Sequence, residues 1–183
     1  MYGLVNKAIK NLALASGGAD CWSAITKVAE LDDDHFLSME AYPDELTVQL
    51  VSAASEVLGL TSEEVLRRFG RYWVLYTAAE GYGTMLQQTG SNVREFLANL
   101  DMLHSRVSTQ LPELRPPSFE VEDGSEPNQI LLYYYSERAG LTPMVCGLIE
   151  GVGEMFSTDL TIKQLKQKEA LQDPDVFEIT LSP

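Results

Sequence analysis

The chain contains few of the residues that form the commonest reactive and metal sites. Its 183 residues include only 2 histidines and 2 cysteines. Cys21 and Cys146 make no C-x-x-C or C-x-x-C-H sequence, which excludes a disulfide framework and covalent c-type cofactor attachment. Because His35 lies in an acidic loop and the cysteines are isolated from each other, a tetrahedral zinc site is hard to assemble. No G-x-S-x-G turn occurs, so Ser-His-Asp chemistry lacks its nucleophile.

Positive charge is also scarce. Lys and Arg number 13 against 27 Asp and Glu, which gives a net charge of −14. Such a surface repels nucleic acid and anionic membranes, so neither is expected as a partner. No segment approaches the roughly 18 apolar residues of a membrane span. The apolar run that follows Lys7 and Lys10 is too short for a signal peptide, and the expected location is the cytoplasm.

The first two-thirds of the chain shows helical periodicity. The Gly17-Gly18 pair and Gly59 mark helix ends, whereas Thr61 with Glu64 fits a capping box that opens a helix. Asn92 is the predicted N-cap of a further helix, with Glu95 at the reciprocal position. Helices are predicted, in chain order, over residues 5–16, 22–29, 45–58, 61–76 and 92–111.

The pattern changes at Pro116-Pro117, because neither proline can continue a helix. Alternating segments then predict strands over 119–122, 130–136, 160–163 and 176–181. An apolar helix is predicted over 141–156, between the second and third strands. Helices first and an antiparallel sheet afterwards predict an α+β fold, and the length fits a single domain over 1–183.

His104 lies in the middle of an apolar helix face. Leu97, Leu100, Val107 and Leu111 share that face with it. The pattern alone favours a buried histidine that bonds to a backbone carbonyl. Haem is the alternative, because it needs only one protein ligand to hold its iron.

Tyr134, Ser136 and Arg138 alternate along the second predicted strand. Residues two apart share a strand face, so two hydroxyls and a guanidinium would point the same way and could bind a carboxylate. Such a set is more often an exposed strand face, but here the strand runs directly into a turn at Gly140. One helix-borne histidine and a carboxylate clamp suggest a ligand with both a metal and acid groups. Haem, with its iron and two propionates, is such a ligand.

The segments around these residues resemble the H-NOX (haem nitric oxide/oxygen binding) domains of bacterial sensors and of soluble guanylate cyclase. The matching segments are 90–97, 100–104, 115–119 and 134–140. The resemblance runs from the Met-Tyr-Gly-Leu-Val-Asn start, which looks most like the cyanobacterial sensors, to the last predicted strand. It implies non-covalent haem b, buried between a helical distal lobe (about 1–60) and a proximal lobe with the sheet (about 61–183).

The resemblance also assigns residues to the haem. His104 matches the proximal iron ligand, and Tyr134, Ser136 and Arg138 match the propionate ligands. Pro117 matches a proline that presses on the porphyrin, with Pro116 as the alternative if the alignment shifts by one. The implied distal residues are Trp73, Met144, Leu148, Val5 and Ile9.

The distal residues decide which gas is expected. Bound dioxygen carries partial superoxide charge and needs a hydrogen-bond donor, whereas NO and CO depend on one much less. Oxygen-binding family members carry a tyrosine where this chain has Met144, or Pro143 if the alignment shifts by one. A thioether is at best a weak acceptor, and Trp73 is a candidate donor. We therefore expect binding of NO and CO and exclusion of oxygen.

The resemblance implies a sensor and not an enzyme. NO binding would release His104 from the iron, the haem would relax against Pro117, and a partner in trans would detect the moved helix. The expected partner is a histidine kinase or a nucleotide cyclase. The alternatives are an oxygen-binding or redox-active haem protein and a haem-free interaction domain. A peroxidase would need a distal acid–base pair, which the implied distal positions lack.

Overall fold

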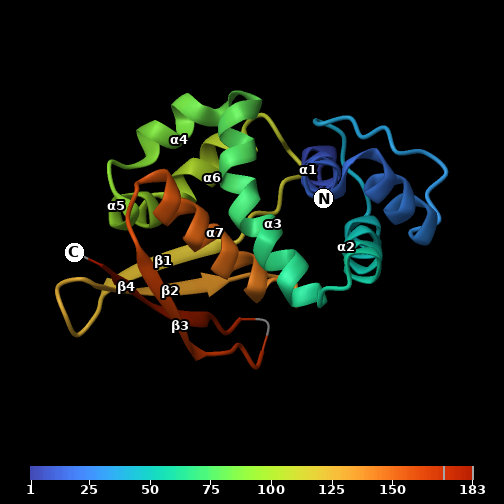
Figure 1. Cartoon of the computed structure of the whole chain (residues 1–183). Helices are drawn as coiled ribbons and strands as arrows, with labels where there is room; N and C mark the ends of the chain where they lie inside the picture. The colour runs from blue at the N-terminus through green and yellow to red at the C-terminus, as the bar shows by residue number, and fades with distance from the viewer. Residues whose placement is uncertain (171, 183) are drawn as a thin grey trace.

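The computed structural model describes residues 1–170 and 172–182 and has an α+β fold, with helices packed on one face of an antiparallel sheet (Figure 1). The helices are α1 (Gly3–Val28), α2 (Asp44–Leu58), α3 (Ser62–Thr77), the π-helical η1 (Ala78–Tyr82), α4 (Gly83–Thr89), α5 (Val93–Ala98), α6 (Leu100–Ser108) and α7 (Thr142–Met155). The strands are β1 (Ser118–Asp123), β2 (Gln129–Tyr135), β3 (Leu160–Lys166) and β4 (Asp175–Leu181). The predicted fold class is confirmed.

The sheet has the strand order β1-β2-β4-β3, and all neighbouring strands are antiparallel. The register places Phe119 opposite Tyr134 and Tyr134 opposite Asp175. These side chains share the inner face with the buried Ile130 and Phe177, as the two-residue period of a strand requires. The connection from β2 to β3 contains α7, which covers this inner face (Figure 1).

Several helix ends follow local sequence signals. In the predicted capping box, Glu64 N donates to Thr61 Oγ1 (3.2 Å) and Thr61 N donates to Glu64 Oε2 (2.8 Å). Gly59 ends α2 in the left-handed conformation, at φ 63°. Within α1, Gly17 and Gly18 leave helical geometry, so the two predicted helices are one element with a kink. No helix among residues 1–170 and 172–182 has both the length and the apolar character to cross a membrane.

The structure differs from the predicted helix over 92–111. Asn92 is its N-cap, accepting from Glu95 N at 2.9 Å, but the helix breaks at Asn99 into α5 and α6. The Asn99 amide donates to the carbonyl of Thr89 (2.8 Å), and this contact with the preceding helix accompanies the break. The prediction also missed η1 and α4, where Gly81 adopts φ 99°.

Two hydrophobic clusters meet along α3. The first contains α1, α2 and residues such as Phe69, and the second contains the sheet, α5 to α7 and Val74. The backbones of α3 and α7 are in direct contact, because a Cβ on Gly147 would lie 1.9 Å from the Arg67 carbonyl oxygen. A Cβ on Gly70 would likewise lie 2.1 Å from the Met144 carbonyl oxygen. This contact fixes the spacing of the two helices.

Candidate functional site

A cavity of about 750 Å³ lies between the N-terminal helices and the sheet, within the size range of ligand and cofactor sites. Nine of the ten predicted site residues line it: Val5, Trp73, His104, Pro117, Tyr134, Ser136, Arg138, Met144 and Leu148. Pro116 also lines the cavity. Ile9 does not, because its side chain is 4% exposed and packs in the first hydrophobic cluster. The structure therefore brings together residues that are up to 143 positions apart.

His104 reaches the cavity from α6. Its Nδ1 is buried and has no hydrogen-bond partner among the described residues. Burial lowers the pKa of His104, although the Asp101 carboxylate opposes this shift. The imidazole is therefore neutral at physiological pH, the form that binds metals. Its ring lies 5.9 Å from the Phe119 ring, which lies 5.4 Å from the Tyr134 ring.

Asp101 fastens α6 to the start of β1. Its Oδ1 accepts from Phe119 N (2.9 Å), and its Oδ2 accepts from Ser118 Oγ (2.5 Å). Ser118 directly follows Pro117, so one carboxylate fixes the helix that bears His104 relative to the two prolines. Asp101 was not among the residues predicted from the sequence.

The turn after β2 presents the predicted carboxylate clamp. Because β2 ends at Tyr135, only Tyr134 lies in the strand, and the expected shared strand face does not extend to Ser136 and Arg138. A turn at Gly140 (φ 76°) directs the chain into α7, and Arg138 N donates to Ser136 Oγ (3.1 Å). Burial raises the pKa of Tyr134, so its phenol keeps the proton needed to donate a hydrogen bond.

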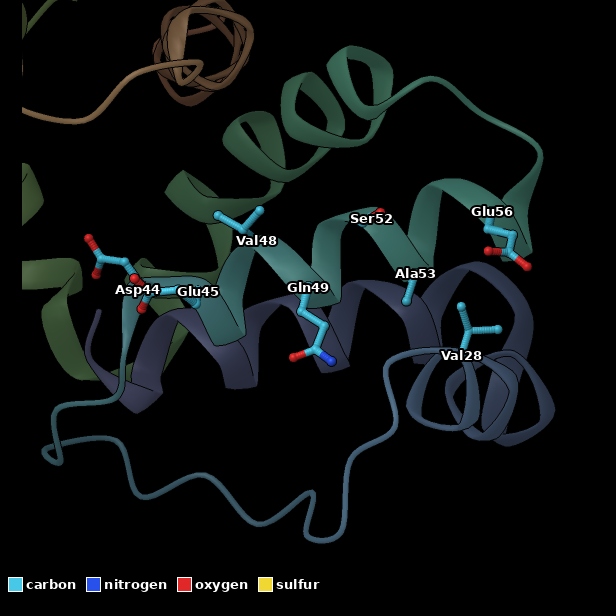
Figure 2. A pocket seen from close by; sticks show the side chains of 8 residues that line it. All are labelled: Val28, Asp44, Glu45, Val48, Gln49, Ser52, Ala53 and Glu56. Carbon is cyan, nitrogen blue, oxygen red and sulfur yellow. The ribbon is translucent and has the colours of Figure 1, made fainter.

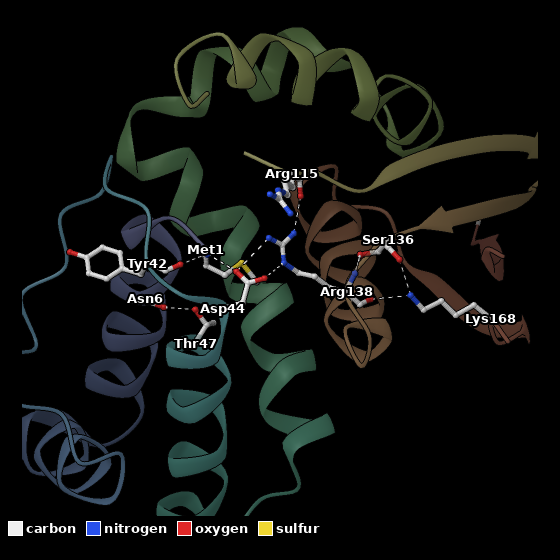
Figure 3. Close-up of polar contacts among 9 residues, drawn as sticks. All are labelled: Met1, Asn6, Tyr42, Asp44, Thr47, Arg115, Ser136, Arg138 and Lys168. Atoms are coloured by element: carbon white, nitrogen blue, oxygen red, sulfur yellow. Dashed lines mark hydrogen bonds and ion pairs between the residues drawn. The ribbon is translucent and has the colours of Figure 1, made fainter. Parts of the chain in front are cut away.

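The Arg138 guanidinium already binds a carboxylate in this position (Figure 3). Nε donates to Asp44 Oδ2 at 2.7 Å, and Nη1 donates to the Arg115 carbonyl at 2.8 Å. Asp44 also accepts from the α-ammonium group of Met1 at 2.6 Å. Hydrogen bonds from Arg138 and then from this ammonium group lower the pKa of Asp44, against the opposite effect of burial. The guanidinium thus links the clamp to the start of α2.

Trp73 and Met144 lie on the two helices whose backbones touch. The Trp73 ring packs 5.8 Å from Phe69 and 6.3 Å from Tyr76, which fixes it within the first cluster. Met144 is partly buried against the same cluster, and its carbonyl oxygen is the atom next to Gly70. This part of the cavity wall is therefore held by the packing of α3 against α7.

Two other places carry acidic side chains but do not form a comparable site. A groove of about 600 Å³ along α2, shown in Figure 2, is lined by Val28, Asp44, Glu45, Val48, Gln49, Ser52, Ala53 and Glu56. Its lining has no histidine, and Val48 is 67% exposed, so it lacks the buried character of the central cavity. In the cluster of Asp33, Asp34 and His35, the Asp34 Oδ2 atom is already bound by Lys10 Nζ at 2.7 Å.

Comparison with known proteins gives one consistent result. The Haem-NO-binding family model matches residues 2–164. Soluble guanylate cyclase gcy-35 of Caenorhabditis elegans is 28% identical over 186 residues, covering 97% of this chain and 26% of that protein. Guanylate cyclase soluble subunit beta-2 of Rattus norvegicus is 40% identical over 111 residues, covering 60% of this chain and 16% of that protein. The chain thus spans about a quarter or less of these relatives.

Two solved structures share the fold across the whole chain. An H-NOX protein mutant from S. oneidensis in the Fe(II) state has a TM-score of 0.89 at 20% identity, covering 100% of this chain and 97% of that chain. An H-NOX protein from S. oneidensis in the Fe(II)NO state has a TM-score of 0.86 at 20% identity, covering 100% of both chains.

Proposed function

The chain belongs to the Haem-NO-binding family, and on this premise we propose that it holds haem b in the central cavity and senses NO and CO while excluding oxygen. The family consists of haem-based gas sensors related to soluble guanylate cyclase. Its shared domain is a sensor and not a catalyst, so the prediction of a non-enzyme is confirmed.

One observation carries the proposal for haem: a buried histidine with an unpartnered ring nitrogen and a carboxylate-binding turn border the same apolar cavity among the described residues. His104 would bind the iron, while Tyr134, Ser136 and Arg138 would hold the propionates. Arg138 is suited to this role, because its guanidinium borders the cavity and binds the Asp44 carboxylate there. When bound, the haem supplies an iron with a coordination position open to a diatomic gas.

The proposed gas selectivity depends on side chains near Trp73. Val5, Met144 and Leu148 carry no N–H or O–H group on their side chains. They offer no hydrogen bond to the partial negative charge of bound oxygen, whereas NO and CO need none. H-NOX proteins from S. oneidensis have been solved in Fe(II)NO and Fe(II)CO ligation states. Their fold supports the comparison, and the three donor-free side chains support the selectivity, whereas the Trp73 indole N–H is the donor that a test must separate from them.

The proposed output is a movement of α6. This helix has nine residues and is separated from α5 by the break at Asn99, so it can shift as a short rigid unit. Release of His104 from the iron would leave Asp101 as a remaining polar tether between α6 and β1. The distal and proximal lobes would then have two relative positions, one with His104 bound to the iron and one with His104 released. We propose that a cytoplasmic partner in trans, a histidine kinase or a nucleotide cyclase, binds one of these two positions preferentially.

Absorption spectroscopy tests the proposal. The purified ferrous protein is expected to show a Soret band that shifts with NO and with CO, and it should form no stable ferrous-oxy complex in air. His104→Gly should lose haem unless imidazole is added, whereas the exposed His35→Gly should retain it. A stable ferrous-oxy spectrum would contradict the selectivity. Haem retention by His104→Gly without imidazole would contradict the ligand assignment, and no Soret band in the wild type would favour the haem-free alternative.

A further inference from the structure

One lysine binds main-chain carbonyls of the turn that carries the predicted propionate ligands (Figure 3). Lys168 Nζ donates to the carbonyl oxygens of Ser136 (2.8 Å) and Arg138 (3.1 Å). The lysine comes from the connection between β3 and β4, some 30 positions after the turn. Two carbonyls of one turn therefore converge on a single ammonium group, which satisfies both of these partly buried acceptors.

Lys168 is itself fixed by a buried carboxylate. Its backbone N–H donates to Asp175 Oδ1 at 3.2 Å, and Asp175 is 0% exposed. Asp175 also accepts from Gln164 Nε2 (3.0 Å) in β3 and from Thr142 Oγ1 (3.3 Å) at the start of α7. Since Asp175 pairs with Tyr134 in the sheet, this network connects Lys168 to β2, β3 and the start of α7.

The side chains of the turn lie on the cavity side. Ser136 and Arg138 line the cavity, whereas Lys168 is not part of its lining. Both carbonyls of the turn point to Lys168. Within the turn, the Arg138 backbone N–H donates to Ser136 Oγ. The Ser136 hydroxyl can still donate its proton, and the Arg138 guanidinium extends toward Asp44.

We propose that Lys168 is a positioning residue that holds the clamp in its carboxylate-binding shape before the ligand arrives. The inference rests on the proposed haem function and extends it to a residue outside the cavity. A turn fixed in advance loses less conformational freedom on binding, so the advantage appears as tighter retention of a dicarboxylate ligand. Lys168 makes no contact with the ligand in this role and acts through the Ser136 and Arg138 carbonyls.

Haem transfer to excess apomyoglobin tests this role, with haem and its dimethyl ester compared in the same variants. Esterification removes the charged propionates but leaves the iron and the porphyrin. Lys168→Met is expected to lose haem roughly 10-fold faster than the wild type, a change of about 1.4 kcal/mol that lies near the low end for hydrogen bonds from a charged donor. The same variant should lose the dimethyl ester at nearly the wild-type rate. Lys168→Arg should restore most of the retention, and the exposed Lys166→Met should match the wild type.

Other outcomes separate this inference from the function on which it rests. Equal acceleration for haem and its ester would overturn the positioning role and indicate a general loss of structure. An unchanged rate in Lys168→Met would overturn it as well. If Lys168→Met does not fold, Lys168→Ala, which removes the same donors, must show the same faster loss of haem with unchanged loss of the ester. If the wild type binds no haem, the proposed function fails and this inference fails with it.

Discussion

The Asp44 carboxylate lies against the Arg138 guanidinium, with Oδ2 2.7 Å from Nε, and so joins the start of α2 to the turn after β2 across 94 positions of sequence. Both side chains are partly exposed, 43% for Asp44 and 26% for Arg138, so solvent screens the pair. The main effect of the pair is to fix the position of Arg138. This guanidinium is held by the N-terminal helices as well as by its own turn.

The first prediction concerns the pH dependence of this ion pair. The pKa of Asp44 is lower in the folded state than the ordinary aspartate value, so the pair stabilises the fold above about pH 4 and loses this effect as the pH falls through the folded-state pKa. Asp44→Asn should reduce the free energy of unfolding by about 1 kcal/mol or less near pH 7. Urea unfolding at a series of pH values measures the difference from the wild type.

The matched control is the exposed neighbour Glu45→Gln, which removes a charge from the same helix turn without touching Arg138. Its effect on the free energy of unfolding should stay small at every pH. A difference between Asp44→Asn and the wild type that persists undiminished at the acid end would contradict the assignment.

The second prediction concerns the link between α6 and β1. Asp101→Ala removes the acceptor of Phe119 N and Ser118 Oγ, which should cost about 1–3 kcal/mol of unfolding free energy. Haem should also dissociate faster, because His104 lies on the loosened helix. Ser105→Ala is the control, since its hydroxyl bonds only to the Asp101 carbonyl within the helix. Equal stability of both variants in urea would show that the link contributes nothing.

The third prediction concerns the contact between α3 and α7. Gly147→Ala would place a methyl group 1.9 Å from the Arg67 carbonyl oxygen, so the helices must separate, at a cost of about 2 kcal/mol or more. Gly153→Ala on the same helix should cost less, because the added methyl group would lie 2.8 Å from the Leu160 side chain and 2.9 Å from the Thr158 carbonyl oxygen, both farther than 1.9 Å. Thermal unfolding compares the two variants, and the reverse order of stability would contradict the proposed backbone contact.

Local sequence signals predicted much of the fold. The capping box at Thr61, the N-cap at Asn92 and the stop at Gly59 depend on residues within a few positions of one another, so the sequence contains all that they need. The break at Asn99 was missed because its partner is the Thr89 carbonyl of another helix. An apolar face that continues through a break looks the same in sequence as an unbroken helix.

The residues that line the candidate site were predicted from the sequence, but the contacts that hold them in place were not. The resemblance to a family supplied the residues around the cavity, which the structure brings together except for Ile9. The supporting residues Asp44, Asp101 and Lys168 were missed, because their partners lie 94, 17 and 32 positions away. In sequence, an aspartate at the start of a helix is already explained by the helix dipole, and an exposed lysine needs no explanation.

The fourth prediction concerns gas selectivity. Met144→Tyr would place a hydroxyl donor in the cavity wall, which should allow the ferrous protein to bind oxygen, seen as a stable ferrous-oxy spectrum in air. Met144→Leu, which changes the side chain without adding a donor, should form no stable ferrous-oxy complex. If Met144→Leu gained the same ferrous-oxy spectrum, the pocket volume and not the donor would control oxygen binding. Trp73→Phe in the Met144→Tyr background would show whether the indole N–H contributes.

Because α3 and α7 are in direct contact, the shape of the pocket and its proposed selectivity depend on different atoms. Main-chain atoms at Gly70 and Gly147 set the distance between the helices, so the size of side chain 144 does not determine it. A different residue at 144 therefore alters the chemistry offered to a gas while the scaffold stays in place. In evolutionary terms, we expect that one codon can retune the ligand preference of such a sensor, whereas neither glycine can gain a side chain without moving the helices apart.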